Sequence, residues 1–297
     1  MPLLTVFTPT YNRAHTLTRT YNSLCRQTCK DFEWLVIDDG STDNTRELVQ
    51  RFIDDSFISI RYIYKENGGL YTGYNTAYAN IETELNVCID SDDYMPDNAV
   101  ELIVETWRKR GTKQYAGIIG LDYYADGSGP IGGLFPKTMT ECYMLDLHIK
   151  HIHREDSKQV MRTDLMKQIA PQVGFPGEKN FNPVYMLWKV CDNYPLLVLN
   201  KNLCYVDYQI GDSMSAAIFK QYIDSPRSFA KGRIIEMGLK HSTFLNNVRL
   251  SIHYVASSLI ARDKKWLKNT PYKVMAVCVI PLGFALYLYI IYKNRQK

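Results

Sequence analysis

Short apolar runs alternate with longer amphipathic stretches over the first third of the chain. Four runs rich in β-branched and other apolar residues recur about every 25–30 positions, at residues 3–8, 33–37, 58–64 and 85–89. After the first run, Leu17, Tyr21 and Leu24 follow at spacings of four and three, which predicts an amphipathic helix. Strands separated by helices imply right-handed crossovers, so we expect an α/β fold with a mostly parallel sheet flanked by helices.

Turn residues mark the starts of two further helices. Ser41 or Thr42 is placed to cap a helix that carries Leu48, Val49 and Phe52. Residues 66–69 read Glu-Asn-Gly-Gly and predict a glycine turn before a helix over about residues 70–81. The alternation of strand and helix therefore continues to the fourth strand.

The fourth strand runs directly into three carboxylates, Asp90, Asp92 and Asp93. Ligands of parallel sheets bind outside the carboxyl ends of the strands, where residues 8–11 and 38–41 are also expected. Like charges held close together repel unless a cation neutralises them, and hard oxygen ligands select Mg²⁺ or Mn²⁺. The pattern predicts a divalent metal site, and an ordinary Asp-rich turn is the alternative.

The same edge can meet the needs of a nucleotide. Tyr11 offers a flat surface for a base, and Asp38 or Asp39 can accept from a base N–H or ribose hydroxyls. Asp90 and Asp92 with a metal would balance a diphosphate. Neither GxGxxG nor GxxxxGK[ST] follows the first strand, which argues against a dinucleotide dehydrogenase and a P-loop NTPase.

Four segments together resemble the successive signatures of family 2 glycosyltransferases with the Rossmann-like GT-A fold. They are residues 8–13, residues 36–43, residues 66–69 with Asn75, and residues 90–93. The resemblance covers about residues 1–110 strongly and continues more weakly to about residue 230.

The resemblance implies roles for single residues. It assigns the nucleoside to Pro9, Thr10, Tyr11, Asp38 and Asp39, and it adds Asn67 and Asn75 to the donor site. Asp90 would face the ribose and the metal shell, and Asp92 would ligate the metal that bridges the diphosphate, Mn²⁺ or Mg²⁺. Many relatives carry an arginine just before the residue that matches Asn75, whereas this chain has Tyr74 there, which puts an arginine contact to phosphate in doubt.

The resemblance also implies a general base. Inverting transfer, which the family favours, needs a carboxylate near the acceptor hydroxyl. Residues 175–183 resemble a Gly-Glu-Lys segment in which a later acidic residue is usually credited as the base, but Pro183 and Val184 stand at that place. Glu178 is our candidate, with Asp156 and Asp212 as rivals; alternatively, Glu178 is a helix-start carboxylate favoured by the dipole.

Loops of the second half carry further expectations. The glycine-rich residues 122–135 are expected to form a mobile loop that could close over a donor sugar. Residues 206–215 look like the loop that relatives fold over the diphosphate. His148, His151 and His153 have no matched cysteine or carboxylate, so we expect a surface turn rather than a metal site.

Composition limits the partners and the compartment. Net charge is only +4, so there is no basic field for nucleic acid, which we exclude as a partner. The seven cysteines form no paired CxxC pattern, which favours buried thiols in a reducing compartment. Residues 1–4 show no sign of a signal peptide, so we expect the body of the protein to stay in the cytoplasm.

From residue 226 the pattern changes. Arg227, Lys231, Arg233 and Lys240 alternate with apolar residues, as in a basic amphipathic helix at a membrane surface. A second helix has one apolar face that would lie at the membrane surface or, equally, in the protein core; the face is formed by Leu245, Val248, Ile252, Val255 and Leu259. Residues 274–292 contain no charge and predict a membrane span or a re-entrant hairpin kinked by Pro281 and Gly283, with a buried core helix as the alternative.

These observations predict two regions, a GT-A domain over residues 1–225 and a membrane-associating helical region over residues 226–297. Residues 1–110 would bind the nucleotide sugar and residues 111–225 the acceptor. We expect a metal-dependent, inverting glycosyltransferase at the cytoplasmic face of the membrane. It would use a nucleoside-diphosphate sugar, with UDP-sugars favoured, and a lipid-linked or other saccharide acceptor. An inactive sugar-nucleotide-binding membrane protein and, less favoured, a sugar nucleotidyltransferase are the alternatives.

Overall fold

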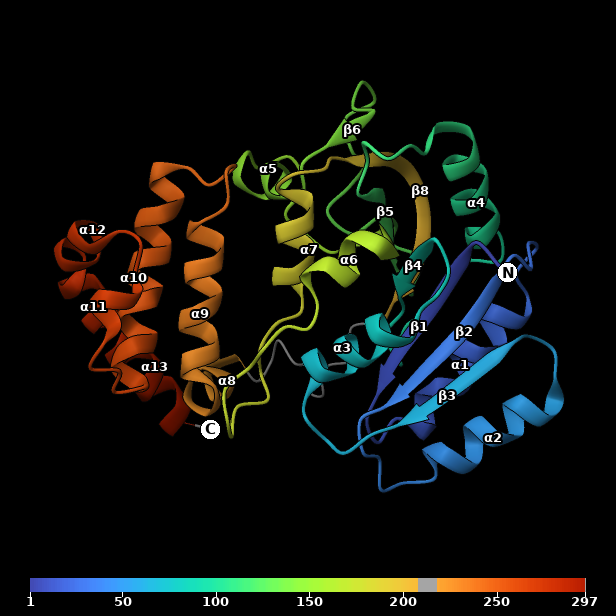
Figure 1. Cartoon of the computed structure of the whole chain (residues 1–297), viewed down its shortest axis with the longest axis horizontal. Helices are drawn as coiled ribbons and strands as arrows, with labels where there is room; N and C mark the ends of the chain where they lie inside the picture. The colour runs from blue at the N-terminus through green and yellow to red at the C-terminus, as the bar shows by residue number, and fades with distance from the viewer. Residues whose placement is uncertain (208–217, 297) are drawn as a thin grey trace.

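A computed structural model describes residues 1–207 and 218–296 of the chain. An eight-stranded sheet with helices on both faces occupies one side of the molecule, and a group of C-terminal helices stands beside it (Figure 1). The predicted α/β architecture is confirmed. The strands are β1 (Leu4–Thr10), β2 (Phe32–Asp38), β3 (Ile60–Tyr64), β4 (Leu85–Cys88), β5 (Gly117–Tyr124), β6 (Glu141–Cys142), β7 (Ser157–Arg162) and β8 (Leu196–Val206).

The sheet has the order β3-β2-β1-β4-β7-β5-β8-β6. Its first four strands are parallel, so β1, β2 and β4 end at one edge. All seven residues of β1 are buried, as expected of a central strand covered on both faces. Strand β7 runs antiparallel between β4 and β5 and joins the two halves of the sheet.

Seven helices cover the sheet, and their apolar faces form two cores. They are α1 (Ala14–Cys25), α2 (Thr45–Asp55), α3 (Leu70–Asn80), α4 (Ala99–Arg110), α5 (Met144–Ile149), α6 (Thr163–Ile169) and α7 (Val184–Cys191). Helices α1, α2 and α4 pack on one face around Trp34, and α3, α6 and α7 pack on the other around Phe7. Burying one such side chain contributes about 1.5–3 kcal/mol, which fixes the strand ends in place.

The start of α2 differs from the prediction. Asp43 accepts a hydrogen bond from the backbone N–H of Thr45 at 3.1 Å, while the Ser41 hydroxyl accepts from the N–H of Asn12 at 2.9 Å. The prediction that Ser41 or Thr42 caps this helix is therefore wrong. Ser41 instead ties the loop after β2 to the loop after β1.

Residues 122–135 are held at both ends. Strand β5 continues to Tyr124, and Tyr123 forms a β-bridge with Pro130. The N–H of the buried Phe135 donates to Asn200 Oδ1 at 2.8 Å. These contacts anchor the glycine-rich segment to the sheet.

The C-terminal region is helical, as expected. Its helices are α8 (Ile218–Asp224), α9 (Pro226–Met237), α10 (Phe244–Ile260), α11 (Trp266–Asn269), α12 (Lys273–Cys278) and α13 (Ile280–Arg295). Gly232 of α9 lies against Tyr185 of α7, where an added Cβ would be 2.2 Å from Tyr185 Cζ. The absence of a side chain at residue 232 therefore lets α9 pack closely against the sheet domain.

The apolar segment 274–292 is divided between α12 and α13, which meet at Val279. Pro281 lies in the first turn of α13, a position that tolerates proline. An added Cβ on Gly283 would be 2.5 Å from Val255 Cγ1, so α13 packs closely on α10. Within residues 1–207 and 218–296, no helix has the length and apolar character needed to cross a membrane.

Two predicted surfaces of this region differ in the structure. Helix α10 buries Val255 of the predicted apolar face together with Leu250 and Tyr254, whereas Leu245 and Leu259 of that face are 78% and 40% exposed. The basic face predicted for α9 is not free either, because Arg227 pairs with Glu178 at 2.8 Å and Arg233 with Glu236 at 3.6 Å. Contacts within the fold take up these residues.

Candidate active site

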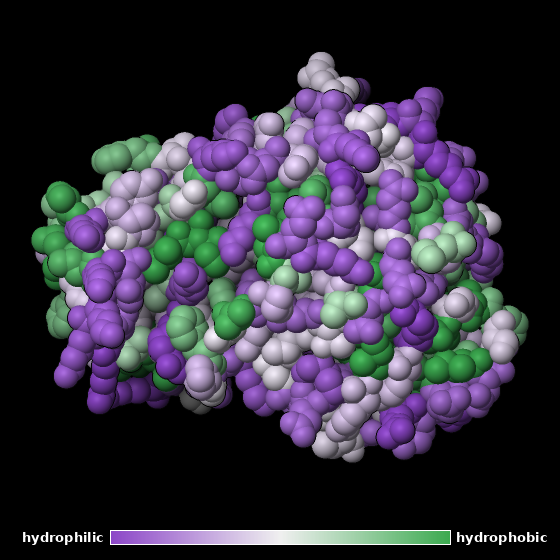
Figure 2. All heavy atoms as spheres, viewed as in Figure 1, coloured by the Kyte–Doolittle hydropathy of each residue, from purple (hydrophilic) through white to green (hydrophobic). Residues whose placement is uncertain are grey.

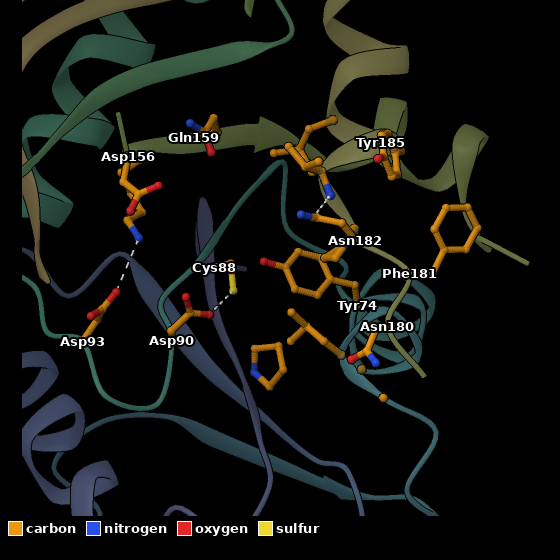
Figure 3. A pocket seen from close by; sticks show the side chains of 18 of the residues that line it. Tyr74, Cys88, Asp90, Asp93, Asp156, Gln159, Asn180, Phe181, Asn182 and Tyr185 are labelled. Atoms are coloured by element: carbon orange, nitrogen blue, oxygen red, sulfur yellow. Dashed lines mark hydrogen bonds and ion pairs between the residues drawn. The ribbon is translucent and has the colours of Figure 1, made fainter. Parts of the chain in front are cut away.

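A cavity of about 1040 Å³ opens at the edge where β1, β2 and β4 end. Its wall is built from the loops after these strands, residues 153–159 before and within β7, residues 179–188, and parts of α8 and α9. Figure 3 shows two chemically different sides, with carboxylates on one and aromatic and amide groups on the other. They are Asp90, Asp93 and Asp156 on the first side and Tyr74, Asn180, Phe181, Asn182 and Tyr185 on the second.

The end of β1 brings Pro9, Thr10 and Tyr11 to this cavity, as predicted for the donor site. Tyr11 is 48% exposed, so its ring is available to a flat ligand. Thr10 Oγ1 is buried without a hydrogen-bond partner among the described residues. Gly73 of α3 passes close to Pro9, where an added Cβ would be 3.2 Å from Pro9 Cβ.

Asp38 and Asp39 are adjacent but have different surroundings. Asp38 is fully buried, does not line the cavity, and accepts from the Tyr62 hydroxyl at 2.6 Å and the N–H of Ser41 at 2.7 Å. Asp39 lines the cavity and accepts from Lys65 and from the N–H of Gly69 at 2.8 Å. The geometry therefore supports a place for Asp39, and not for Asp38, at a ligand.

Of the two asparagines predicted for the donor site, only one lines the cavity. Asn67 lines the cavity, and its Oδ1 accepts from Lys179 Nζ. Asn75 exchanges two hydrogen bonds of 2.8 Å with the backbone of Gln172 and does not line the cavity. Asn75 therefore fixes a loop, whereas Asn67 is open to a ligand.

Asp90 and Asp92 both line the cavity just beyond β4. The backbone N–H of Ile89 donates to Phe7 O at 3.0 Å, which continues the pairing with β1 up to Asp90. The Asp90 carboxylate faces the cavity, but the surrounding protein desolvates it and raises its pKa, and Asp92 raises the pKa further while Lys158 lowers it. A carboxylate in this environment gains from a nearby cation.

Lys158 is the main feature of this floor that the sequence did not predict. Its Nζ lies 3.7 Å from Asp122 Oδ2 and 3.9 Å from Asp93 Oδ2, and all three side chains are largely buried. Burial alone would lower the pKa of Lys158, but the carboxylates of Asp122 and Asp93 outweigh it and raise that pKa. Burial also raises the pKa of Asp122, to about 6. In the sequence, the polar residues 157–159 were the signal that could have indicated a place for Lys158 in this site.

Among the described residues, no group of three or more His, Cys, Asp or Glu side chains is arranged to hold a metal ion. Mg²⁺ and similar ions in sugar-nucleotide sites commonly take one or two protein carboxylates and complete their shell with phosphate and water. The pair Asp90 and Asp92, both facing the cavity, fits that smaller requirement.

Glu178 lies apart from the cavity lining, and the protein occupies its carboxylate. It accepts from the N–H of Ser228 at 2.7 Å, from the N–H of Arg227 at 3.1 Å and from Arg227 Nε at 2.8 Å. These groups form the first turn of α9, so Glu178 acts as a cap for a helix far along the chain. Its assignment as the base stays a prediction that this geometry does not support.

Of the two rival candidates for the general base, only Asp156 lies within the described residues. Asp156 lines the cavity and is exposed to it beside the Asp93 side of the floor (Figure 3). Pro183 and Val184, where the resemblance implied a second acidic residue, also line the cavity. Asp212 and most of the predicted loop 206–215 lie outside the described residues.

The three histidines do not form one surface turn. His153 is buried and packs against Phe135, with ring centroids 4.8 Å apart, whereas His151 is exposed. His148 and His153 line the cavity. The prediction of a surface turn is therefore wrong for His153, because the loop folds inward beneath residues 122–135.

Known proteins share parts of this arrangement. The solved structure of S. aureus TarS residues 1–349 in complex with UDP-GlcNAc superposes with a TM-score of 0.66 and 18% identity, covering 100% of this chain and 92% of that one. The mannosyltransferase PcManGT from Pyrobaculum calidifontis, in complex with GDP-Man and Mn²⁺, gives a TM-score of 0.56 and 14% identity, covering 97% and 87%. At these identities the likeness shows the fold, which is of the GT-A type.

Sequence relatives match a shorter stretch. Chondroitin synthase from Pasteurella multocida (strain Pm70) is 34% identical over 112 residues, which are 38% of this chain and 12% of that protein. The alignment thus spans a small part of the relative's own length. The sequence profile "Glycosyl transferase family 2" matches residues 5–166, more than half of the 297 residues. The chain therefore belongs to glycosyltransferase family 2.

Proposed function

We propose that this protein transfers a sugar from a nucleoside-diphosphate sugar, with UDP-sugars favoured, to a saccharide acceptor. The observation that carries the proposal is the meeting of Tyr11, Asp39 and the pair Asp90 and Asp92 on one cavity at the carboxyl ends of parallel strands. Tyr11 would stack on the base, and Asp39 with Asn67 would hold the nucleoside. The cavity is large enough for such a donor and an acceptor sugar.

Asp90 and Asp92 are the residues that would hold a divalent cation, Mn²⁺ or Mg²⁺. Such an ion supplies positive charge to the departing diphosphate. The chain's own contribution is to hold the two carboxylates at the floor, with Lys158 limiting the repulsion among Asp90, Asp93 and Asp122.

Transfer with inversion requires a base that takes the proton from the acceptor hydroxyl. Of the two described candidates, Asp156 lines the cavity and Glu178 does not, so we assign the base to Asp156. Its carboxylate would accept the hydroxyl proton as the acceptor oxygen attacks the donor sugar.

We place the acceptor at a membrane. Helices α12 and α13 expose apolar side chains, among them Val274 at 79%, Leu282 at 58% and Phe284 at 49%. Hydrophobic side chains gather over this part of the molecule in Figure 2. Lys273 and Lys293 lie at the two ends of this stretch and would face anionic headgroups. A lipid-linked saccharide at the cytoplasmic face would then lie within reach of the cavity.

Donor binding tests the proposal directly. Titration calorimetry with UDP-, GDP- and dTDP-sugars, with and without Mn²⁺, should give saturable binding that requires the ion for at least one donor. Release of the nucleoside diphosphate in the presence of membrane lipid extract should follow. Absence of binding to every donor would overturn the proposal.

One observation favours a second function, a sugar-nucleotide-binding protein without transferase activity. The family resemblance implies a second acidic residue where Pro183 and Val184 stand, and α9 occupies Glu178. Such a protein would bind a donor without either transferring or hydrolysing it. A nucleotidyltransferase would instead release pyrophosphate from a nucleoside triphosphate.

A further inference from the structure

The side of the cavity built by α5, α9 and the loop before β7, which we call the cationic side, takes its charge from two arginines, because burial and then Arg249 lower the pKa of its histidine. His148, Arg154 and Arg233 line it. This side differs from the floor at β4 and β7, where Asp90, Asp93, Asp122 and Asp156 gather around Lys158.

Arg233 is the central residue of the cationic side. Its side chain is only 17% exposed; Nη2 donates to the Tyr222 hydroxyl at 3.1 Å, and Nη1 lies 3.6 Å from Glu236 Oε2. The Nε atom is buried with no hydrogen-bond partner among the described residues. A guanidinium held in this way is oriented before any ligand arrives, which lowers the entropy lost on binding.

The neighbouring charges leave this side positive. Arg249 pairs with the same carboxylate, Glu236, at 3.4 Å, so two arginines share one acid. Arg154 adds a third guanidinium, whose Nη2 lies 2.6 Å from His151 Nε2. Burial, and then Arg233 and Arg249, lower the pKa of His253.

The donor does not need this charge. A nucleoside diphosphate in the proposed function is served by Tyr11, Asp39 and the Asp90 and Asp92 pair on the other side of the cavity. An anionic acceptor, by contrast, would be repelled by the acidic floor unless a cationic group held its charge away from it. The acidic floor and the cationic side would therefore hold the donor and an anionic acceptor in different parts of one cavity.

We propose that Arg233, Arg154 and His148 form a subsite for an oxyanion, a phosphate or a carboxylate, carried by the acceptor. This inference rests on the proposed function. If the protein transfers a sugar, the subsite identifies the acceptor as an anionic saccharide or saccharide phosphate. The Nη1 and Nη2 atoms of Arg233 each carry a second N–H beyond their contacts with Glu236 and Tyr222, and these groups would meet the oxyanion. Arg154 adds charge at the exposed rim.

The test uses the full chain and three probes: inorganic phosphate, glucuronate and uncharged glucose. Thermal unfolding is followed as each probe is titrated in the presence of saturating UDP and Mn²⁺, which excludes probe binding at the donor site. One or both oxyanions should raise the Tm saturably, and glucose should not. Phosphate acting alone identifies a phosphorylated acceptor, and glucuronate acting alone identifies a uronate.

Variants locate the effect. Arg154→Gln, at an exposed side chain, should weaken the oxyanion response at least about fivefold while UDP binding is unchanged. Arg233→Lys should weaken it as well, because lysine keeps the charge but loses the planar fork. Arg51→Gln, on the exposed face of α2, is the matched control.

Two outcomes would overturn the subsite. One is an oxyanion response that is equal in the wild type, Arg154→Gln and Arg51→Gln; the other is no response at all in a protein that binds UDP. Loss of UDP binding itself would instead count against the proposed function. Donor and acceptor assignments can therefore fail separately.

Discussion

The carboxylate of Glu178 accepts a 2.7 Å hydrogen bond from the backbone N–H of Ser228, fifty residues later in the chain. This bond and those from Arg227 satisfy N–H groups at the start of α9, which would otherwise lack partners. The acceptor-side loop and the C-terminal helices are thereby joined by one side chain. The sequence placed Glu178 near a helix start, but the helix is α9.

Replacing Glu178 should first affect stability. Glu178→Gln removes a buried charge that accepts from three N–H groups, and we expect a loss of about 1–3 kcal/mol in the free energy of unfolding. Urea denaturation measures this loss, with Glu105→Gln on the exposed face of α4 as the control. Abolished transfer at unchanged stability would show instead that Glu178 is the base.

Replacing Asp156 should affect turnover. Asp156→Asn removes the proposed proton acceptor, and we expect sugar transfer to fall at least about 100-fold while the Kd for UDP is unchanged. Glu155→Gln, the neighbouring carboxylate on the same loop, should retain most of the activity. Equal losses in the two variants would count against Asp156.

The metal assignment makes a third prediction. Loss of a group that supports a metal ligand weakens metal binding roughly 10–100-fold, and loss of the ligand itself should weaken it at least as much. Asp92→Asn should therefore bind Mn²⁺ much more weakly. Mn²⁺ binding in the presence of UDP is followed by electron paramagnetic resonance, and chelation should stop transfer reversibly. Asp97→Asn, exposed beyond the same loop, is the control. Unchanged Mn²⁺ affinity in Asp92→Asn would remove Asp92 from the metal site.

The contribution of His253 to stability should fall on acidification. Burial, and then Arg233 and Arg249, lower its pKa from 6.5 to about 4 in the folded protein. The unfolded chain therefore binds the proton more readily, and the folded state loses stability as the pH decreases from about 6.5 to about 4, by on the order of 3 kcal/mol.

The pH dependence of urea denaturation checks this sign. His253→Gln should remove much of the slope, whereas His15→Gln at an exposed position of α1 should not. A slope that His253→Gln leaves unchanged would contradict the assignment.

The exposed apolar face of α12 and α13 should bind membranes. Substituting Leu282 and Phe284 together by Glu removes two side chains, each worth about 1.5–3 kcal/mol on full burial, and should weaken vesicle binding at least about tenfold. Co-sedimentation with vesicles containing anionic lipid measures the effect. Phe57→Glu, 72% exposed after α2, controls for surface charge. Binding that survives the double substitution would place the membrane contact elsewhere.

Local patterns were sufficient for the donor half. The alternation of apolar runs and amphipathic stretches predicted β1 to β4 and α1 to α3, because each element there is specified by its own residues. The parallel order then placed Tyr11, Asp90 and Asp92 on one edge. That inference needed no knowledge of distant contacts.

The rest of the site depends on contacts between residues that are far apart in the sequence, which no single segment of the sequence encodes. Asp38 and Asp39 have the same chemistry, and only the hydrogen bond from Tyr62 shows that the first is turned away from the cavity. Strand β7 carries Lys158 into the acidic floor from a different half of the sheet. The sequence predicts Arg233 on a basic surface face, but in the structure its side chain is 17% exposed and donates to Tyr222.

Gly232 has a consequence for how the acceptor half can vary. The ring of Tyr185 occupies the space that a methyl group at residue 232 would need. Even alanine there would push α9 outward and carry Arg233, one position further on, away from its place in the wall. A side chain at residue 232 would therefore need a smaller side chain at residue 185 for Arg233 to keep its place in the wall.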